Sequence, residues 1–188
     1  AITAADFAKS AQYLLNPKAA NYRADSYYSG QLIIANAQGY AKQGMEDTQN
    51  ALTAAGVAWA SWDQTALVTT ESGLTIGVYA NSYAFRNDPP ADPQAHLKAG
   101  IQALKEQGAE VIIASLHWGI EGKYTPNSTQ KELARVAIDA GANIVYGHHT
   151  HTLQPIETYN GGVIYYSLGN FSFGGNRNPS EKDTAVVQ

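Results

Sequence analysis

The sequence contains no cysteine, and its 188 residues include only 1 methionine and 4 phenylalanines. The absence of cysteine excludes disulfide bonds, thiolate zinc sites and cysteine nucleophiles. Any metal ion must therefore be bound by histidine, aspartate, glutamate or asparagine. A chain without cysteine fits an extracytoplasmic bacterial protein, although many cytosolic proteins also lack cysteine.

The sequence also has only a small excess of negative over positive charge and no long apolar run. The net charge is −4 and no run of lysine and arginine occurs, which argues against nucleic acid as the main partner. The longest apolar runs have only the length of a strand, so we expect no segment to span a bilayer. Ala1 opens no signal peptide, but a leader or anchor could precede it on a longer parent chain. The length and the 44% of hydrophobic residues predict one globular domain.

Histidines, in contrast, are concentrated at one place. Three of the five lie within residues 148–151, directly after an apolar run over residues 142–146 that predicts a buried strand. Side chains at positions i and i+2 of an extended segment point in the same direction. We therefore expect His149 and His151 to direct their imidazoles at one point.

A second predicted strand, over residues 111–116, ends at His117. Strand ends at one edge of an α/β sheet are where such folds bind ligands. The imidazoles of His117, His149 and His151 together predict a metal centre. The alternative is that they are surface or hydrogen-bonded loop histidines.

Apolar periodicity predicts an α/β fold. Helices are predicted over residues 4–15, 45–55, 94–107 and 129–140, and Ser128 is expected to cap the last of them. Strands are predicted over residues 31–35, 57–62, 65–70, 74–79, 111–116, 142–146, 156–159, 163–166 and 184–187. Because strand, helix and strand alternate between residues 111 and 146, this stretch predicts a right-handed parallel crossover.

Three separate motifs carry a family resemblance. They are Leu116-His117-Trp118-Gly119-Ile120-Glu121, then Gly141-Ala142-Asn143-Ile144-Val145-Tyr146-Gly147-His148-His149-Thr150-His151, and then Tyr166-Ser167-Leu168-Gly169-Asn170-Phe171, which Phe173-Gly174-Gly175-Asn176 continues. In this order they resemble the H-W-G-x-E, G-A-D-x-V-x-G-H-H-P-H and Y-S-L-G-N-F segments of the capsule-synthesis CapA family, also called the poly-γ-glutamate synthesis family. The likeness is dense over residues 74–188 and weaker before them.

This resemblance implies a partial metallophosphoesterase-like, calcineurin-like fold, with αββα layers and mixed sheets. It implies a metal-dependent phosphoesterase-like hydrolase domain that serves capsule or poly-γ-glutamate biosynthesis at the bacterial cell surface, outside the cytoplasm. The expected partner is a cell-surface polymer or its biosynthetic machinery, and the parent protein is expected to be membrane-anchored. His117, His149 and His151 match the metal-site histidines of the family, which implies one or two divalent ions such as Mn, Zn or Fe.

The sequence also departs from the family pattern. The family's Gly-Asp and Asn-Leu-Glu segments, which supply carboxylates to the metal, are missing, and Ala35-Asn36-Ala37-Gln38 stands where the family has Ala-Asn-Asn-His. Gln38 cannot replace an imidazole ligand, whereas Asn36 keeps a carbonyl oxygen for the site. We therefore expect residues 1–188 to be a single domain truncated at both ends, or a natural short and degenerate member. A sheet without its first strands exposes an edge, which predicts a homo-oligomer.

The expected mechanism uses three imidazoles to hold one ion with an open position for water, which acts as the nucleophile. His148, the additional histidine of the motif, is predicted to be catalytic as a proton donor or a phosphate contact, and its alternative is a hydrogen bond to the backbone. Glu121 is predicted to orient a histidine, and its alternative is a solvated loop carboxylate. Trp118 either lines the cleft or packs the loop.

Asn170 is also expected to line the site, in a turn over residues 167–170 that either binds an anion or positions Phe171 in the core. The loss of the acidic ligands leaves a second function open. The chain would then be a non-catalytic module that binds a surface polymer or a biosynthetic partner.

Overall fold

The computed structural model of the chain describes residues 49–50, 52–54, 58–61, 64–83, 91–170, 178 and 180–187. The elements predicted over residues 4–15 and 31–35, together with Asn36 and Gln38, lie outside these residues. Of the helix predicted over residues 45–55, residues 49–50 and 52–54 are helical.

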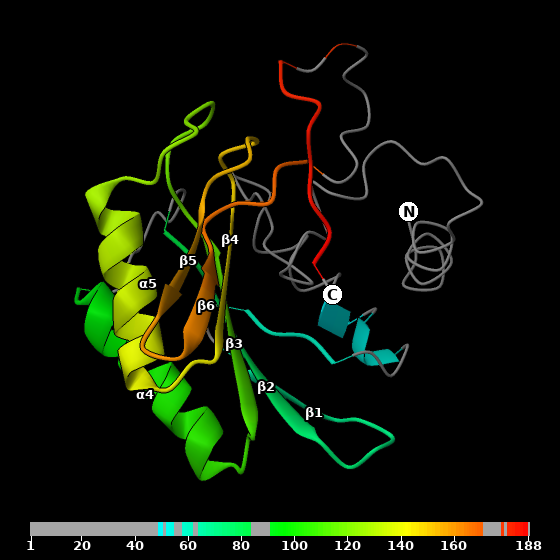
Figure 1. Cartoon of the computed structure of the whole chain (residues 1–188). Coiled ribbons are helices and arrows are strands. Elements are labelled where there is room, and N and C mark those ends of the chain that lie inside the picture. The colour runs from blue at the N-terminus through cyan, green and yellow to red at the C-terminus, as the bar shows by residue number, and fades with distance from the viewer. Residues whose placement is uncertain are drawn as a thin grey trace.

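The described residues form a six-stranded mixed sheet with the order β1-β2-β3-β4-β6-β5 (Figure 1). The four inner strands run parallel, and β1 and β5 are antiparallel strands at the two edges. The α/β class predicted from the sequence is confirmed, and the mixed sheet is consistent with a metallophosphoesterase-like fold. The strands are β1 (Ala66–Thr69), β2 (Thr75–Ser82), β3 (Val111–His117), β4 (Ile144–His148), β5 (Ile156–Tyr159) and β6 (Gly162–Tyr165).

Two helices, α4 (Pro93–Glu106) and α5 (Ser128–Ala140), lie on the same face of the sheet (Figure 1). Helix α4 begins where the Asp92 carboxylate accepts a hydrogen bond from the Ala95 amide at 3.0 Å. Helix α5 is capped by Asn127 and not by Ser128 as predicted. The Asn127 side chain accepts from the Gln130 amide at 2.8 Å, and the Gln130 side chain accepts from the Asn127 amide at 3.1 Å. This reciprocal pair satisfies two amides that the helix leaves free.

The core lies between these helices and the sheet. Leu97, Ile101 and Leu104 of α4 are 0% exposed, as are Ala114, Val145 and Ile164 from three neighbouring strands. Each large apolar side chain buried in this way contributes roughly 1.5–3 kcal/mol to folding. The core therefore fixes the parallel strands relative to one another.

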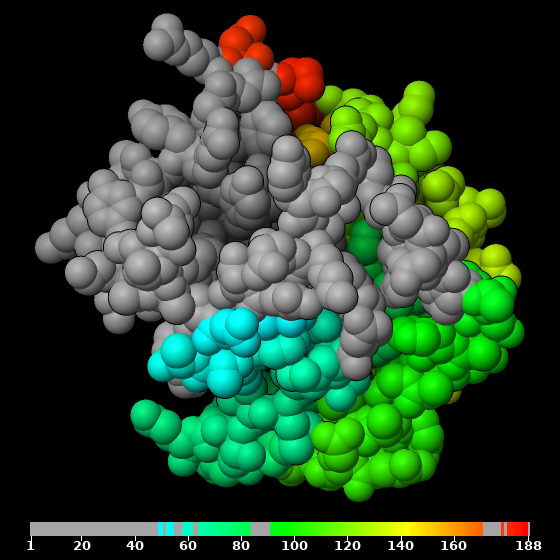
Figure 2. All heavy atoms as spheres, turned by 180° about the vertical axis from the view of Figure 1, so that it is seen from behind, coloured from blue at the N-terminus to red at the C-terminus, as the bar shows by residue number. Residues whose placement is uncertain are grey.

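Strand β1 and the turn that joins it to β2 extend away from this core, whereas Tyr79 of β2 belongs to it (Figure 1). Figure 2 shows the β1–β2 hairpin at the surface from behind, and Leu67, Val68 and Leu74 are 38%, 42% and 38% exposed.

At the other end of the described chain, the strand predicted over residues 184–187 is wrong, because only Thr184 forms an isolated bridge, with Gly169. Among the helices that the structure describes, none is long and apolar enough to cross a membrane.

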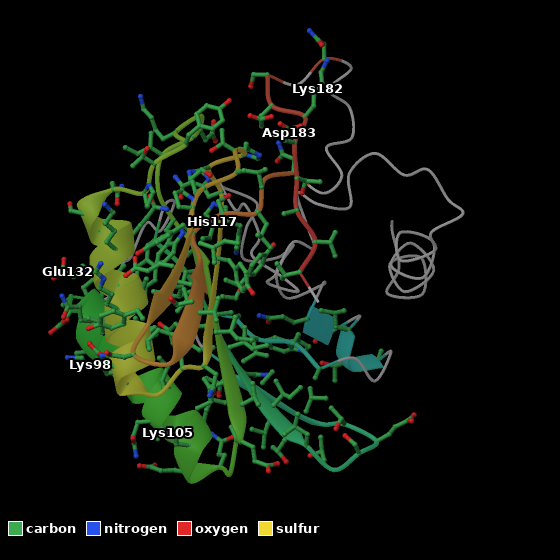
Figure 3. The ribbon with its side chains drawn as sticks, viewed as in Figure 1. Lys98, Lys105, His117, Glu132, Lys182 and Asp183 are labelled. Atoms are coloured by element: carbon green, nitrogen blue, oxygen red, sulfur yellow. The ribbon has the colours of Figure 1, made fainter. Side chains whose placement is uncertain are left out.

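The carboxyl ends of the parallel strands meet at one edge of the sheet. His117 ends β3 and His148 ends β4, and the parallel register pairs these two residues. Figure 3 shows His117 at this edge, whereas Lys98, Lys105 and Glu132 lie on the helices. Strand β4 begins two residues later than predicted and continues into the histidine motif. The sheet thus brings two histidines together at the edge where α/β folds bind ligands.

Candidate metal centre

His117 and His148 lie side by side on the face of the sheet opposite the helices. Leu116 belongs to the core under the helices, and side chains alternate along a strand, so the His117 ring points away from them. The two rings lie 5.0 Å apart between centroids and are nearly perpendicular, at 87°. Both residues are buried, with 9% and 7% of their surface exposed.

His149 and His151 follow β4 in a loop and not in an extended segment, so that part of the sequence argument is wrong. Their φ angles are 101° and 57°, both in the left-handed region that residues other than glycine rarely adopt. Such a conformation costs about 1–3 kcal/mol and is concentrated at functional sites. The two rings still come within 6.2 Å of each other, and His149 stacks on His117 at 4.5 Å between centroids.

Glu121 joins these histidines from the loop after β3. The Lys123 amide donates to the Ile120 carbonyl at 3.3 Å, and Gly122 has a φ of 72°, as the third residue of a type II turn requires. The turn presents the Glu121 carboxylate so that ligand atoms of Glu121, His149 and His151 lie within 4.8 Å of one another. Two imidazoles and a carboxylate are a donor set that suits a divalent transition metal.

The trio that the structure brings together differs from the predicted one at one position. Glu121 lies among the candidate ligand atoms, whereas His117 contacts the group through the stacked ring of His149. The sequence argument had given Glu121 an orienting role. The signal in the sequence is the pair of glycines around Glu121, Gly119 and Gly122. Glycine readily adopts the positive φ angles that both positions have, so the pair indicates a sharp turn directly after a strand end.

Asn170 holds His151 in place. Its side-chain amide donates to the His151 carbonyl at 3.3 Å, so its oxygen faces Nδ1 of the same residue, at 2.6 Å. In the neutral form of an imidazole, this arrangement places the proton on Nδ1 and leaves the Nε2 lone pair for a ligand. Histidines that bind metals are usually oriented in this way.

The surroundings of His117, His148 and His149 favour the neutral form of these three imidazoles. Burial, followed by the neighbouring histidines, lowers the pKa of His117 to about 2 and that of His148 to about 3. Burial also lowers the pKa of His149, although Glu121 opposes this shift. A neutral imidazole offers the lone pair that a metal ion needs.

His148 occupies the most enclosed position of the four. Within the described part of the chain, its Nε2 atom is buried and takes part in no hydrogen bond. The alternative predicted for this side chain, a backbone hydrogen bond, is therefore not made by Nε2. A buried polar atom of this kind costs about 1–3 kcal/mol, a cost that contact with an ion or a polar ligand group would offset.

Trp118 packs the loop and does not line a cleft. It is 2% exposed, its indole N–H donates to the Tyr166 carbonyl at 3.0 Å, and its ring stacks on the Tyr166 ring. Gly147 lies so close that a Cβ atom there would overlap both Trp118 and the Tyr166 carbonyl. This contact explains why glycine precedes the histidines.

Comparison with known proteins places these residues in a family context. The family model described as "Bacterial capsule synthesis protein PGA_cap" matches residues 35–175. The chain is 39% identical over 173 residues to the "PGA biosynthesis protein CapA" of Bacillus subtilis, covering 81% of this chain and 44% of the relative. It is 38% identical over 123 residues to the "Capsule biosynthesis protein CapA" of Bacillus anthracis, covering 62% and 29%.

A third relative comes from another genus. The chain is 33% identical over 153 residues to a "Probable polyglutamine synthesis accessory protein" of Mycobacterium tuberculosis H37Rv, covering 68% of this chain and 40% of the relative. The chain thus spans less than half the length of each of these three relatives.

Proposed function

Because the chain belongs to the family of bacterial capsule synthesis proteins described as PGA_cap, we propose that it is a metal-dependent, phosphoesterase-like hydrolase domain that serves capsule or poly-γ-glutamate biosynthesis. The observation that carries the proposal is the convergence of Glu121, His149 and His151 ligand atoms within 4.8 Å. The names of the two Bacillus relatives support the association with biosynthesis.

In this proposal Glu121, His149 and His151 hold a divalent ion such as Mn, Zn or Fe. A bound ion of this kind supplies Lewis-acid chemistry, because it polarises a phosphoryl oxygen and lowers the pKa of water. Asn170 orients His151 through its Nδ1 atom, and His117 supports the His149 ring from below by stacking.

His148 is proposed to contact the phosphoryl group or the leaving oxygen through Nε2. This atom is buried, and the ring lies 5.0 Å from the His117 ring, beside the candidate ligands. A hydrogen bond from a fixed, desolvated donor stabilises charge more strongly than the same bond in water.

We further propose that the chain acts outside the cytoplasm at the bacterial cell surface, where the polymer and its biosynthetic machinery are the partners. The support is the names of the relatives, one of which is a "Probable polyglutamine synthesis accessory protein".

A second candidate function is a non-catalytic module that keeps the fold and binds the polymer or a partner. One observation favours it: the metal group found among the described residues contains a single carboxylate, that of Glu121. Two-metal hydrolases use several oxygen ligands to hold their ions about 3.5–4 Å apart. A centre with one carboxylate offers fewer oxygen ligands than a two-metal hydrolase uses, which favours a binding role.

The first experiment is elemental analysis of the chain purified without chelator, combined with hydrolysis assays on a phosphomonoester and a phosphodiester. We expect about one equivalent of divalent metal and metal-dependent hydrolysis, both reduced by Glu121→Gln. Glu132→Gln is the matched control, because Glu132 is exposed on α5 and bonds only Gln94 among the described contacts. Metal without hydrolysis would favour the module, and a chain that neither binds metal nor hydrolyses either ester would contradict the proposal.

A further inference from the structure

The candidate ligands come from two different loops. Glu121 lies in the loop after β3, and His149 and His151 lie in the loop after β4. The sheet fixes where each loop starts but not how the two loops lie against each other. The separation of the ligand atoms therefore depends on contacts between the loops.

Two buried glutamines, Gln130 and Gln154, form the centre of these contacts, and we call them the glutamine bridge. The Gln154 side chain donates from Nε2 to the Lys123 carbonyl at 2.8 Å and accepts from Gln130 Nε2 at 2.8 Å. Gln130 in turn accepts from the Asn127 amide at 3.1 Å. Gln154 is 6% exposed and Gln130 is 2% exposed, so water does not compete with these bonds.

The bridge acts close to Glu121. Lys123 is the last residue of the turn that presents the Glu121 carboxylate, and its carbonyl also accepts from the Thr152 hydroxyl at 2.7 Å. The Gly122 amide donates to the Thr150 carbonyl at 2.8 Å. The turn is thus attached at two consecutive residues to the loop that carries His149 and His151.

The chemistry of an amide is needed at the Gln154 position. Its N–H group donates to a carbonyl while its oxygen accepts from a second amide, so both halves of the group are satisfied. An apolar residue offers neither function, and a carboxylate would place an acceptor against the Lys123 carbonyl. A buried amide is costly unless it is fully bonded, which suits a group whose role is to fix geometry.

We propose that Gln154 is a positioning residue for the metal group. Its amide N–H holds the Lys123 carbonyl and thereby keeps the Glu121 carboxylate within coordinating distance of His149 and His151. This inference rests on the proposed function, because it takes those three residues to bind a divalent ion.

The test measures metal affinity and ligand geometry in the whole chain. Zn²⁺ dissociation constants are obtained by competition with a chromophoric chelator, and the Co²⁺ absorption spectrum reports the ligand set. Gln154→Glu keeps the acceptor for Gln130 and removes the donor to Lys123, and Gln154→Met removes both. We expect Zn²⁺ affinity to fall about 10- to 100-fold in each variant, with a changed Co²⁺ spectrum.

Two control variants separate positioning from stability. Gln102→Met removes an exposed amide on α4 that bonds Glu106, and Ile101→Val reduces the packing of the buried core. Neither should change the Zn²⁺ affinity or the Co²⁺ spectrum, even where Ile101→Val lowers the melting temperature. Thr152→Val, which removes the other bond to the Lys123 carbonyl, replaces Gln154→Met if that variant does not fold.

The outcomes are distinguishable. Gln154 variants that bind Zn²⁺ within about twofold of the wild type, with an unchanged Co²⁺ spectrum, would overturn the positioning role and leave the proposed function intact. A wild-type chain that takes up no Zn²⁺ or Co²⁺ would overturn the proposed function and this inference with it.

Discussion

The two faces of the sheet bury different kinds of side chain. Under α4 and α5, Ala114, Val145 and Ile164 are 0% exposed and belong to the apolar core cluster. On the opposite face, at the strand ends, His117 and His148 are almost as buried. The apolar face stabilises the fold, whereas burial of the His148 Nε2 atom, which takes part in no hydrogen bond among the described residues, costs free energy.

The difference extends to the backbone. The residues under the helices lie in regular strands, whereas His149 and His151 adopt positive φ angles directly after a strand. Strain of this kind persists only where surrounding contacts determine the conformation. The apolar region under the helices stabilises the fold, whereas the loop of His149 and His151 holds a strained backbone conformation at the candidate site. Substitutions in the two regions should therefore have opposite signatures.

The largest expected effect lies on the apolar face. Leu104→Ala removes a 0% exposed side chain of α4 and should lower the free energy of unfolding by about 2–5 kcal/mol, because a cavity remains. Urea unfolding followed by circular dichroism measures this change. Leu67→Ala on the exposed hairpin should cost far less, and equal losses in the two variants would contradict the assignment of the core.

A smaller effect of opposite sign is expected at the site. At position 149, with φ at 101°, glycine should be more stable than alanine by about 1 kcal/mol, because only glycine adopts this conformation without strain. Urea unfolding of His149→Gly and His149→Ala without metal measures the difference. Both variants lose the ring, so the comparison isolates the backbone.

The matched pair at an ordinary position is Lys98→Gly and Lys98→Ala on the exposed side of α4. There glycine should be less stable than alanine by about 1 kcal/mol. If glycine were also less stable than alanine at position 149, the left-handed backbone would not be a feature of the folded chain.

An effect of similar size at neutral pH concerns Tyr166, a tyrosine of the apolar core. Burial, followed by the hydrogen bond that Tyr166 donates to Glu157 at 2.8 Å, raises the pKa of the phenol above its ordinary value of 10.0. The folded state thus keeps the proton that the unfolded state releases. The stabilisation is fully present below about pH 10 and is lost as the pH rises above that value.

Tyr166→Phe should therefore lower stability by about 1 kcal/mol at neutral pH and show a weaker decline above about pH 10. Urea unfolding at neutral and alkaline pH checks both expectations. Tyr124→Phe is the control for an exposed phenol, because Tyr124 donates a similar hydrogen bond to Glu181 at 2.7 Å but is 57% exposed. A decline of equal size in wild type and Tyr166→Phe would exclude Tyr166 as its source.

Much of the fold could be predicted from local pattern. Apolar periodicity located α4, α5, β3 and both hairpins to within a few residues, because each pattern reflects which side of one element is buried. It failed at the start of α5, where Asn127 and Gln130 form a reciprocal cap that a lone Ser128 does not signal. It also failed at residues 184–187, where three of the four residues are β-branched but Gly169 is the only described pairing partner.

The sequence by itself determined the α/β class, the clustering of histidines at strand ends and the absence of thiolate chemistry, because these depend on residue types and short spacings. The tertiary structure decided that Glu121 joins His149 and His151, that Trp118 belongs to the core and that Asn170 holds His151. These relations join segments far apart in the chain. They arise only when the parallel register of β3 and β4 brings two loops to one edge of the sheet, where hydrogen bonds between the loops set the distances.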